Sequence, residues 1–306
     1  MDAQFLRVQR ELEETQRQLE IAKQHAARAE EKTAQAEEKT ARLAEEMRMT
    51  TLTEYLEACH NIVFTNFTVE TNMAISSKGT ITKPTGRRCP DKLKPWVDFP
   101  EEQRIRLGKL FSAFPAHIKA FKSLHSLKSL GDDIAAKRVG DENALGLALE
   151  VLVARPVTLI VERLQNEDSI TAEFNIGKGI SFETRLSVLG GSSEGSTPPD
   201  GNKLRPDQIC VFKRPEDLAG LMIAYIIEHK APHKLTLQHL RLGLRPMDID
   251  EEVANRATKP TQENIDAYFK YQADLRSAAA VTQTFDYMIH ARTVASRQGR
   301  RSFSLK

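Results

Sequence analysis

Three charged residues in the second half of the chain have types and a spacing that could bind a metal ion. Glu228 and Lys230 lie two apart after the apolar run 225–227, and Asp207 begins an earlier apolar segment. Residues two apart in an extended strand point to the same side, so the Glu228 carboxylate and the Lys230 ammonium are expected on one face. If the two segments pair in a sheet, a metal-sized gap between Asp207 and Glu228 follows.

Such a gap suits the hydrolysis of phosphodiester bonds. Hard divalent cations such as Mg2+ or Mn2+ bind oxygen ligands, and Mg2+ typically takes one or two carboxylates with water and substrate phosphate. A bound cation lowers the pKa of its water, while Lys230 could position that water or stabilise the departing anion. The alternative is an ordinary solvated Glu–Lys pair at a strand end. The apolar run 225–227 argues against it, because a strand apolar on both faces is a buried central strand.

The elements around these residues are predicted from periodicity. Residues 141–164 carry apolar side chains near the helical period, and Pro156 is expected to kink or break that helix. Residues 180–188 alternate between apolar and polar, which is typical of a half-buried strand. Two more strands and two helices are expected, the last helix with Thr261 as its N-cap, at 207–212, 221–230, 236–244 and 261–297. The order helix, three strands, helix predicts an α/β or α+β domain.

The first 50 residues carry an apolar seam with alternating three- and four-residue steps, the pattern of a left-handed coiled coil. Its members are Phe5, Val8, Leu12, Thr15, Leu19, Ala22, Ala26, Ala29, Thr33, Ala36, Thr40, Leu43 and Met47. Ala and Thr fill the middle of the seam and bury less area than Leu, so association through this helix alone is expected to be weak. A coiled coil that forms a homo-oligomer and a single exposed helix both remain open.

Three regions are expected along the chain: a coiled coil, a helical and loop-rich region, and a core with a basic tail, at 1–50, 51–140 and 141–306. Within the middle region, the stretch 76–100 is rich in Pro and Gly and is expected to be an ordered loop. Residues 101–130 are expected to be helical, with Pro115 splitting the helix in two.

Bulk composition bounds the class of protein. The 306 residues include 44 Lys and Arg against 42 Asp and Glu, a net charge of +2, which by itself implies neither nucleic-acid nor membrane binding. Since the sequence has no apolar run near the roughly 20 residues of a membrane helix, no membrane association is expected. The three cysteines form no Cys-x-x-Cys pair. These features predict an intracellular protein of the nucleus or cytoplasm.

Several short stretches resemble a known group of proteins. The stretches are 205–208 (RPDQ), 225–235 (YIIEHKAPHKL), 243–248 (GLRPMD), 79–86 (GTITKPTG) and 95–100 (PWVDFP). They resemble the PD-(D/E)XK nuclease-like family of uncharacterised fungal proteins, over roughly residues 51–292. The resemblance implies a restriction-endonuclease-like αβββαβ core in which Asp207, Glu228 and Lys230 fall on the metal-binding and catalytic positions.

Two features depart from the pattern of that family. The first core helix often carries another metal-supporting Glu, expected here just before Pro156, where the sequence has Ala154 and Arg155. Glu150, one turn earlier on the same side, is the expected substitute, and Glu142 is a poorer one because it lies near the helix start. The family usually continues into a final strand, whereas this chain ends in a basic, apolar-poor tail. That difference leaves open whether the core keeps its last strand.

The residues that follow the predicted site are basic. His233, Lys234 and Arg241 are expected to contact a nucleic-acid backbone such as DNA, with ordinary surface residues as the alternative. A zinc site at His229 and His233 is not expected, because Pro232 between them disfavours the helix that would bring them together.

Two functions from different classes follow from the sequence. The first is a metal-dependent nuclease in which Asp207, Glu228 and Glu150 hold Mg2+ or Mn2+ and Lys230 assists the attacking water. The alternative is a catalytically inactive nuclease-like protein that acts as a coiled-coil assembly or DNA-binding module. The three intact residues at 207, 228 and 230 favour the first function, and Ala154 with the unusual C-terminus favours the second.

Overall fold

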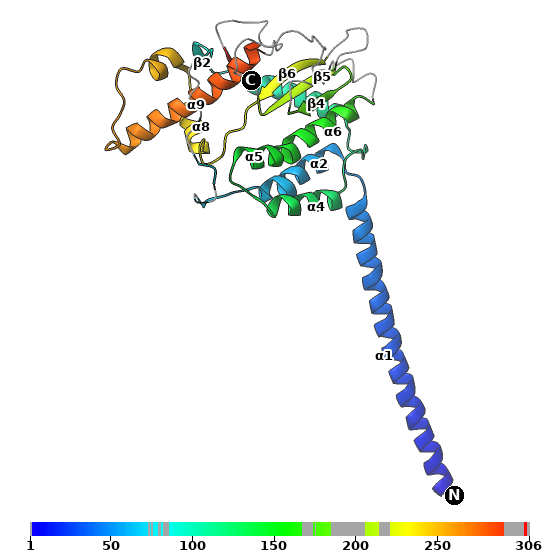
Figure 1. The fold of residues 1–306 in the computed structure, drawn as a ribbon. Coiled ribbons are helices and arrows are strands. Elements are labelled where there is room, and N and C mark those ends of the chain that lie inside the picture. Colours follow the sequence, from blue (N-terminus) through cyan, green and yellow to red (C-terminus); the bar gives the residue numbers. More distant parts are fainter. Residues whose placement is uncertain are drawn as a thin grey trace, which may run out of the picture.

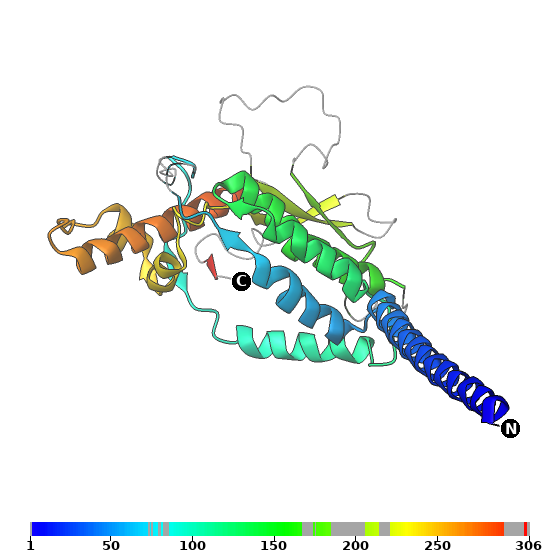
Figure 2. The same cartoon turned by 90° about the horizontal axis from the view of Figure 1, so that it is seen from below.

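The molecule consists of a mixed helix-and-sheet body from which one long helix projects (Figure 1). The computed structural model describes residues 2–72, 74, 76–78, 81, 86–166, 174, 176–184, 206–213, 221–290 and 303–304. The projecting helix leaves the body on the side away from the C-terminal helices, as a second view also shows (Figure 2). The expected mixture of helices and sheet, preceded by a long N-terminal helix, is therefore present.

Helix α1 (Asp2–Met47) is a single 46-residue helix whose described side chains are exposed along almost its whole length. Among the described residues, the ion pairs between α1 and the body lie at its C-terminal end. The Glu46 carboxylate lies 2.9 Å from Lys128 Nζ, and the Arg48 guanidinium donates to both Glu54 carboxylate oxygens, at 2.6 and 3.0 Å. The paired Arg48 lowers the pKa of Glu54 to about 2. The direction in which α1 leaves the body is thus set by charged contacts at its base.

A layer of helices follows α1. Helix α2 (Leu52–Ala58) begins with a capping box formed by Thr51 and Glu54, and continues through the turns η1 (Cys59–Val63) and η2 (Phe64–Asn66). Helices α3 (Phe99–Ala113) and α4 (Leu124–Ala135) replace the long helix expected from residue 101, and Pro115 lies between them as predicted. The layer encloses a core that includes Leu52, Tyr55, Val63, Phe114, Phe121 and Leu127.

Helix α5 (Glu142–Leu149), the wide turn η3 (Glu150–Ala154) and helix α6 (Arg155–Leu164) form one continuous rod. The break that was one expected effect of Pro156 does not occur, and a widened turn lies just before it instead. A proline has no N–H to donate and its ring crowds the carbonyl four residues earlier, so the chain loosens there without ending the helix.

Among the described residues, one helical stretch, Glu142–Leu164, is long and apolar enough to span a membrane by length and composition. In the structure, Val151, Leu152, Leu159 and Ile160 of this stretch pack against the core of the helical layer. These four residues therefore have a packing role within the fold, whereas Leu147 and Val153 of the same stretch are exposed.

Strands β4 (Ile180–Glu183), β5 (Gln208–Lys213) and β6 (Leu221–Ile227) form an antiparallel sheet in that order. The prediction that the 225–227 run is a central strand is wrong for the described sheet: β5 is central, and Tyr225 on β6 is 43% exposed. The run is apolar on both faces because α9 covers one face, while the Tyr225 ring meets Phe182 on the other. The expected continuation of β4 to residue 188 lies outside the described residues.

Short strands complete the body. Strand β1 (Thr68–Val69) pairs in parallel with β3 (Arg138–Val139). Strand β2 (Lys92–Lys94) lies between β7 (Met247–Asp248) and β8 (Phe303–Ser304). The described C-terminal strand β8 therefore joins β2 and does not extend the sheet of β4, β5 and β6. The segment 291–302, which carries most of the basic residues of the tail, lies outside the described residues.

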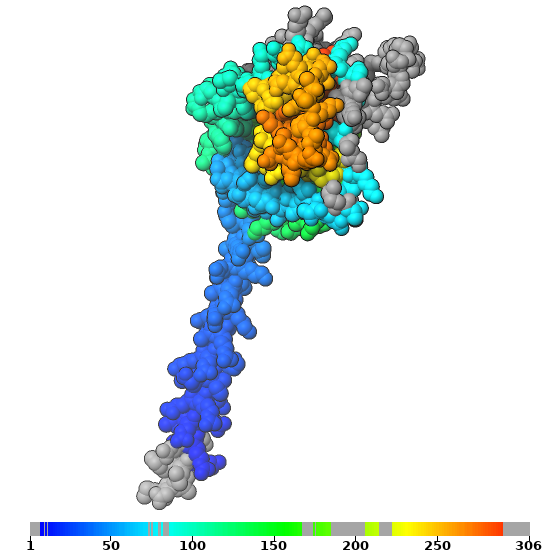
Figure 3. Space-filling model, turned by 90° about the vertical axis from the view of Figure 1, so that its left-hand side faces the viewer, coloured from blue at the N-terminus to red at the C-terminus, as the bar shows by residue number. Residues whose placement is uncertain are grey.

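Two C-terminal helices form one end of the molecule, where they face the viewer in Figure 3. Helix α8 (Leu237–Gly243) has Thr236 as its N-cap, and the turn η5 (Asp250–Ala254) leads to α9 (Ile265–His290). The expected cap at Thr261 is wrong, because the Asn264 side chain accepts from the Ala267 amide at 3.1 Å and the helix begins after it. The far end of α9 packs Tyr287 and Met288 against the sheet.

Candidate functional site

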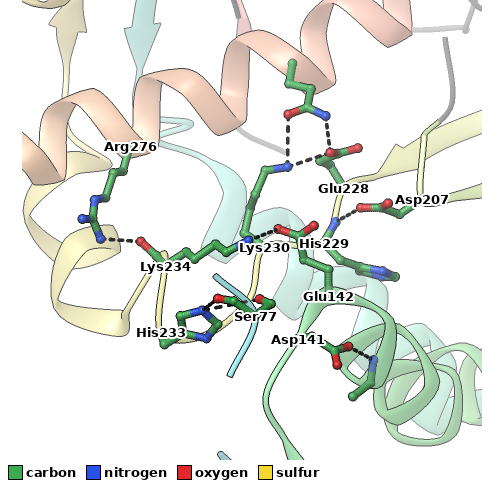
Figure 4. A network of polar contacts seen from close by, with 12 residues as sticks. Ser77, Asp141, Glu142, Asp207, Glu228, His229, Lys230, His233, Lys234 and Arg276 are labelled. Atoms are coloured by element: carbon green, nitrogen blue, oxygen red, sulfur yellow. Dashed lines mark hydrogen bonds and ion pairs between the residues drawn. The ribbon is translucent and has the colours of Figure 1, made fainter. Parts of the chain in front are cut away.

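The candidate site lies where β5 begins and β6 ends. Gln208 pairs with Ile227, so Asp207 and Glu228 come next to one another at the edge of the antiparallel pair (Figure 4). Strand β6 was expected to reach residue 230 but ends at Ile227. Pro206 has no N–H with which to continue the ladder, and the His229 amide donates to Asp207 Oδ2 instead, at 2.7 Å.

Glu228 and Lys230 form a buried ion pair. Their side chains are 6% and 9% exposed, and Lys230 Nζ lies 2.7 Å from Glu228 Oε1. The Gln283 side chain from α9 bridges the two charges: its Oε1 accepts from Lys230 at 3.1 Å, and its Nε2 donates to Glu228 Oε1. The pair is therefore held from the side of α9 (Figure 4).

Gln283 is the residue that sequence reasoning missed. Its Nε2 also donates to the Tyr287 hydroxyl, one turn later, at 3.2 Å. The available signal was the group of polar residues Thr282, Gln283 and Asp286 within an otherwise apolar part of α9, all of which prove to be buried. Buried polar side chains need partners, so such a group indicates a polar contact across the core.

One carboxylate oxygen of Glu228 has hydrogen-bond partners, and the other has none among the described residues. Burial raises the pKa of Glu228, and the Asp207 and Glu142 carboxylates add to that rise while Lys230 opposes it. Among the described residues, Glu228 Oε2 is buried with no hydrogen-bond partner. A buried unpaired carboxylate oxygen is costly, so this atom is a ready acceptor for a proton, a water or a cation.

A cavity of about 710 Å³ opens beside Asp207. Its charged lining consists of Asp141, Glu142, Glu150, Glu183, Asp207 and Lys234. Among the described residues, five carboxylates against one ammonium make this lining acidic. A polyanion would be repelled from this wall unless cations bound there first.

His229 lines the same cavity and is 6% exposed. Burial lowers the pKa of His229, an effect that the Asp207 and Glu142 carboxylates oppose and Lys230 reinforces. Helix α5 comes close to the imidazole at Gly146, where an added Cβ would meet His229 Nδ1 at 3.0 Å. The neutral imidazole therefore forms part of the packing between the site and α5.

The structure distributes the predicted metal ligands unevenly. Asp207 and Glu228 are brought together, whereas Glu150 lines the cavity while accepting from Gln208 Nε2 at 3.3 Å and lying 3.5 Å from Arg155 Nε. Within the part of the chain that the structure describes, no three His, Cys, Asp or Glu side chains are close enough to form a complete metal cage. Asp207 lines the cavity, whereas Glu228 is nearly fully buried and is not part of the cavity lining.

The three residues predicted to contact nucleic acid have different surroundings. His233 Nε2 lies 2.8 Å from the Ser77 carbonyl, and Lys234 Nζ lies 3.9 Å from Glu142. The Lys234 carbonyl accepts from Arg276 at 2.6 Å, which ties this segment to α9. Arg241, on α8, is exposed. His233 and Lys234 thus make contacts within the fold, and Arg241 is the most accessible of the three.

The comparisons with known proteins identify the family. The model of the Spore killer 2 N-terminal domain matches residues 51–204, half of the chain. The chain belongs to this family. The match to the Spore killer 2 N-terminal domain begins shortly after α1 and ends before Asp207, so it includes the helical layer, β4 and Glu150 but not Asp207 or Glu228.

The chain is also similar to a curated fungal protein. It is 28% identical over 270 residues to the meiotic driver SPOK2 of Podospora anserina, which is 80% of this chain and 34% of that protein. The chain therefore spans about a third of the length of the curated relative it matches. No solved structure matches the chain.

Proposed function

We propose that the protein is a metal-dependent nuclease that hydrolyses phosphodiester bonds of nucleic acid, with DNA as the expected substrate. The observation that carries the proposal is the meeting of Asp207 and Glu228 at one sheet edge, with Lys230 against Glu228. The resemblance of residues 205–235 to PD-(D/E)XK nucleases gives the same assignment. The fungal family to which the chain belongs is compatible with that resemblance.

Asp207 and Glu228 would hold Mg2+ or Mn2+. Hard cations accept carboxylate oxygens, and Glu228 Oε2 is a buried carboxylate oxygen without a hydrogen-bond partner among the described residues. When bound, the ion would supply Lewis-acid activation of a water and neutralise charge on the phosphate. Its positive charge would also offset the acidic wall, which would otherwise repel the substrate. Glu150 remains a proposed third ligand that would first have to leave Gln208 and Arg155.

The side chains around the ion would have separate roles. Lys230 would orient the attacking water or stabilise the departing oxygen, and its contact with Glu228 places it beside the expected ligand. Gln283 would fix the positions of both charges by bridging them from α9. His229 would orient Asp207, because its amide donates to one of the two carboxylate oxygens.

The name of the curated relative gives the proposed context. That relative is a meiotic driver, and the family is named for spore killing. We propose that this chain contributes a nucleic-acid-cleaving activity to such a driver. Because the chain spans about a third of the relative, the activities of the remaining two thirds are not ascribed to it.

The test is nicking of supercoiled plasmid by the purified chain with Mg2+ or Mn2+, with EDTA as the chemical control. Asp207→Asn removes a ligand charge with little change of shape, and Glu183→Gln is the matched control on the same acidic cavity. We expect metal-dependent nicking that Asp207→Asn abolishes and Glu183→Gln retains. Folded wild-type protein that cleaves neither duplex nor single strands would support the inactive assembly or DNA-binding module instead.

A further inference from the structure

Among the described residues, exposed apolar side chains form a long stripe along the seam of α1. Leu19 is 55% exposed, and Leu12, Leu43 and Met47 are also exposed. The small residues between them, from Ala22 to Thr40, are exposed as well. Apolar residues in a continuous helical stripe are an interaction surface, because a soluble chain gains free energy by covering them.

The body leaves this seam uncovered up to its base. The body contacts α1 through Glu46 and Arg48, while Leu43 and Met47 remain exposed. A second helix could therefore lie along α1 without displacing any contact between α1 and the body.

We propose that the occupant of the seam is α1 of a second copy of the chain, running antiparallel. Two identical seams match best when residue i of one helix faces residue 48 − i of the other. Leu12 then faces Ala36, Leu19 faces Ala29, and Ala22 faces Ala26. Leu12 and Leu19 thus lie opposite small side chains, while Ala22–Ala26 is a small layer and Phe5–Leu43 a large one.

Charges beside the seam favour the same arrangement. In the heptad numbering of the seam, Lys23 and Glu30 both occupy the e position, beside the apolar stripe. In the antiparallel register, Lys23 of each copy lies across from Glu30 of the other, which gives two opposite-charge contacts about the twofold axis. Both side chains are exposed and therefore available for these contacts.

In a parallel dimer, the side chains of the seam would pack less evenly. In register, Leu19 would face Leu19 and Ala29 would face Ala29, so the helices would be held apart at bulky layers and leave gaps at the alanines between them. Lys23 would face Gln18 and would have no carboxylate opposite it. The self-complementarity of the sequence thus points to the antiparallel pair.

The antiparallel pair fixes the shape of the dimer. With a rise of 1.5 Å per residue, the 46 residues of α1 are about 69 Å long. Since the contacts of Glu46 and Arg48 fix each body to the C-terminal end of its own helix, the two bodies would lie at opposite ends of the shared rod. This proposal does not depend on nuclease activity.

Sedimentation equilibrium of the full chain tests the proposal. Leu19→Glu places a charge in the seam, and Ile21→Glu makes the same change at a position of similar exposure, 48%, on another face of α1. We expect a concentration-dependent dimer in the wild type and in Ile21→Glu, and monomer in Leu19→Glu. A wild-type chain that stays monomeric at all concentrations would overturn the proposal, as would equal association of the two variants.

Charge reversal tests the direction of the helices. Glu30→Lys should weaken the antiparallel dimer by about tenfold or more, because both opposite-charge contacts become repulsive. Adding Lys23→Glu should restore the dissociation constant, since the reversed charges again face one another. A dimer that the second change does not restore, or that is indifferent to both changes, would show a parallel arrangement and would overturn the proposal.

Discussion

The two sides of the candidate site differ in what surrounds their charges. Asp207 lines an acidic cavity, and one of its carboxylate oxygens accepts a hydrogen bond from the His229 backbone amide. Glu228 and Lys230, in contrast, are buried against α9 and bridged by Gln283. The open side is where substrate and cation can arrive. On the sealed side, burial of the two charges has a large desolvation free energy, so the partners of these charges contribute to folding stability as well as to chemistry.

The sealed pair gives the largest expected effect. Lys230→Met leaves the Glu228 carboxylate buried without its cation and should lower the free energy of unfolding by about 3–5 kcal/mol. Lys234→Met is the matched control, because Lys234 is paired at 3.9 Å with a half-exposed Glu142 and its loss should cost about 1 kcal/mol or less. Urea unfolding of both variants measures the difference. Equal losses of unfolding free energy in the two variants would show that the ion pair on the sealed side is no more costly to break than the one on the open side.

The bridge between the two charges gives the next largest effect. Gln283→Leu keeps the ion pair but removes two hydrogen bonds to it, and should lower the free energy of unfolding by about 1–3 kcal/mol. Gln272→Leu makes the same change at a half-exposed position of the same helix and should be nearly neutral. If Gln283→Leu were as mild as Gln272→Leu, then Gln283 would not hold the pair.

The packing of the open side against α5 gives a smaller effect. Gly146→Ala brings a Cβ to 3.0 Å from His229 Nδ1 and should cost about 1–2 kcal/mol, because the imidazole or the helix must shift. Gly108→Ala, in α3, meets no atom within 4 Å and should stabilise the protein by about 0.5–1 kcal/mol. Thermal melts of the two variants should therefore move in opposite directions. A stabilised Gly146→Ala would contradict the close approach.

Titration of His229 gives the smallest effect. Because burial lowers its pKa below the ordinary value of 6.5, the unfolded chain binds this proton more readily than the folded chain. Stability linked to His229 is therefore present above that value and is lost as the pH falls through the folded-state pKa. Replacing it (His229→Gln) should reduce the loss of unfolding free energy between pH 7.5 and 5.5.

Much of the fold could be predicted from periodicity. The strands around residues 180, 208 and 221, the split at Pro115 and the helix that starts near residue 236 all depend on local sequence, and the structure confirms them. The strand order could not be predicted in the same way. A strand apolar on both faces indicates burial, but either a neighbouring strand or a helix can supply that burial, and here α9 does so.

In the candidate site too, local features could be predicted from the sequence and long-range contacts could not. The proximity of Glu228 and Lys230 was predictable, since it depends on residues two apart in one segment. The contact with Gln283, 53 residues after Lys230, depends on how α9 crosses the sheet, which no local pattern encodes. The ties of Glu150 to Gln208 and Arg155 were missed for a similar reason, because the side-chain direction at the widened turn η3 is not that of a regular helix.

The central claim, that Asp207 holds a catalytic metal ion, is tested most directly by changing the ligand and the metal together. Asp207→Cys replaces a hard oxygen ligand with a soft thiolate, which favours softer metal ions such as Cd2+. We predict that the variant loses plasmid nicking with Mg2+ and regains it with Cd2+, while the wild type remains active with Mg2+. Undiminished nicking by Asp207→Cys with Mg2+ would contradict the claim.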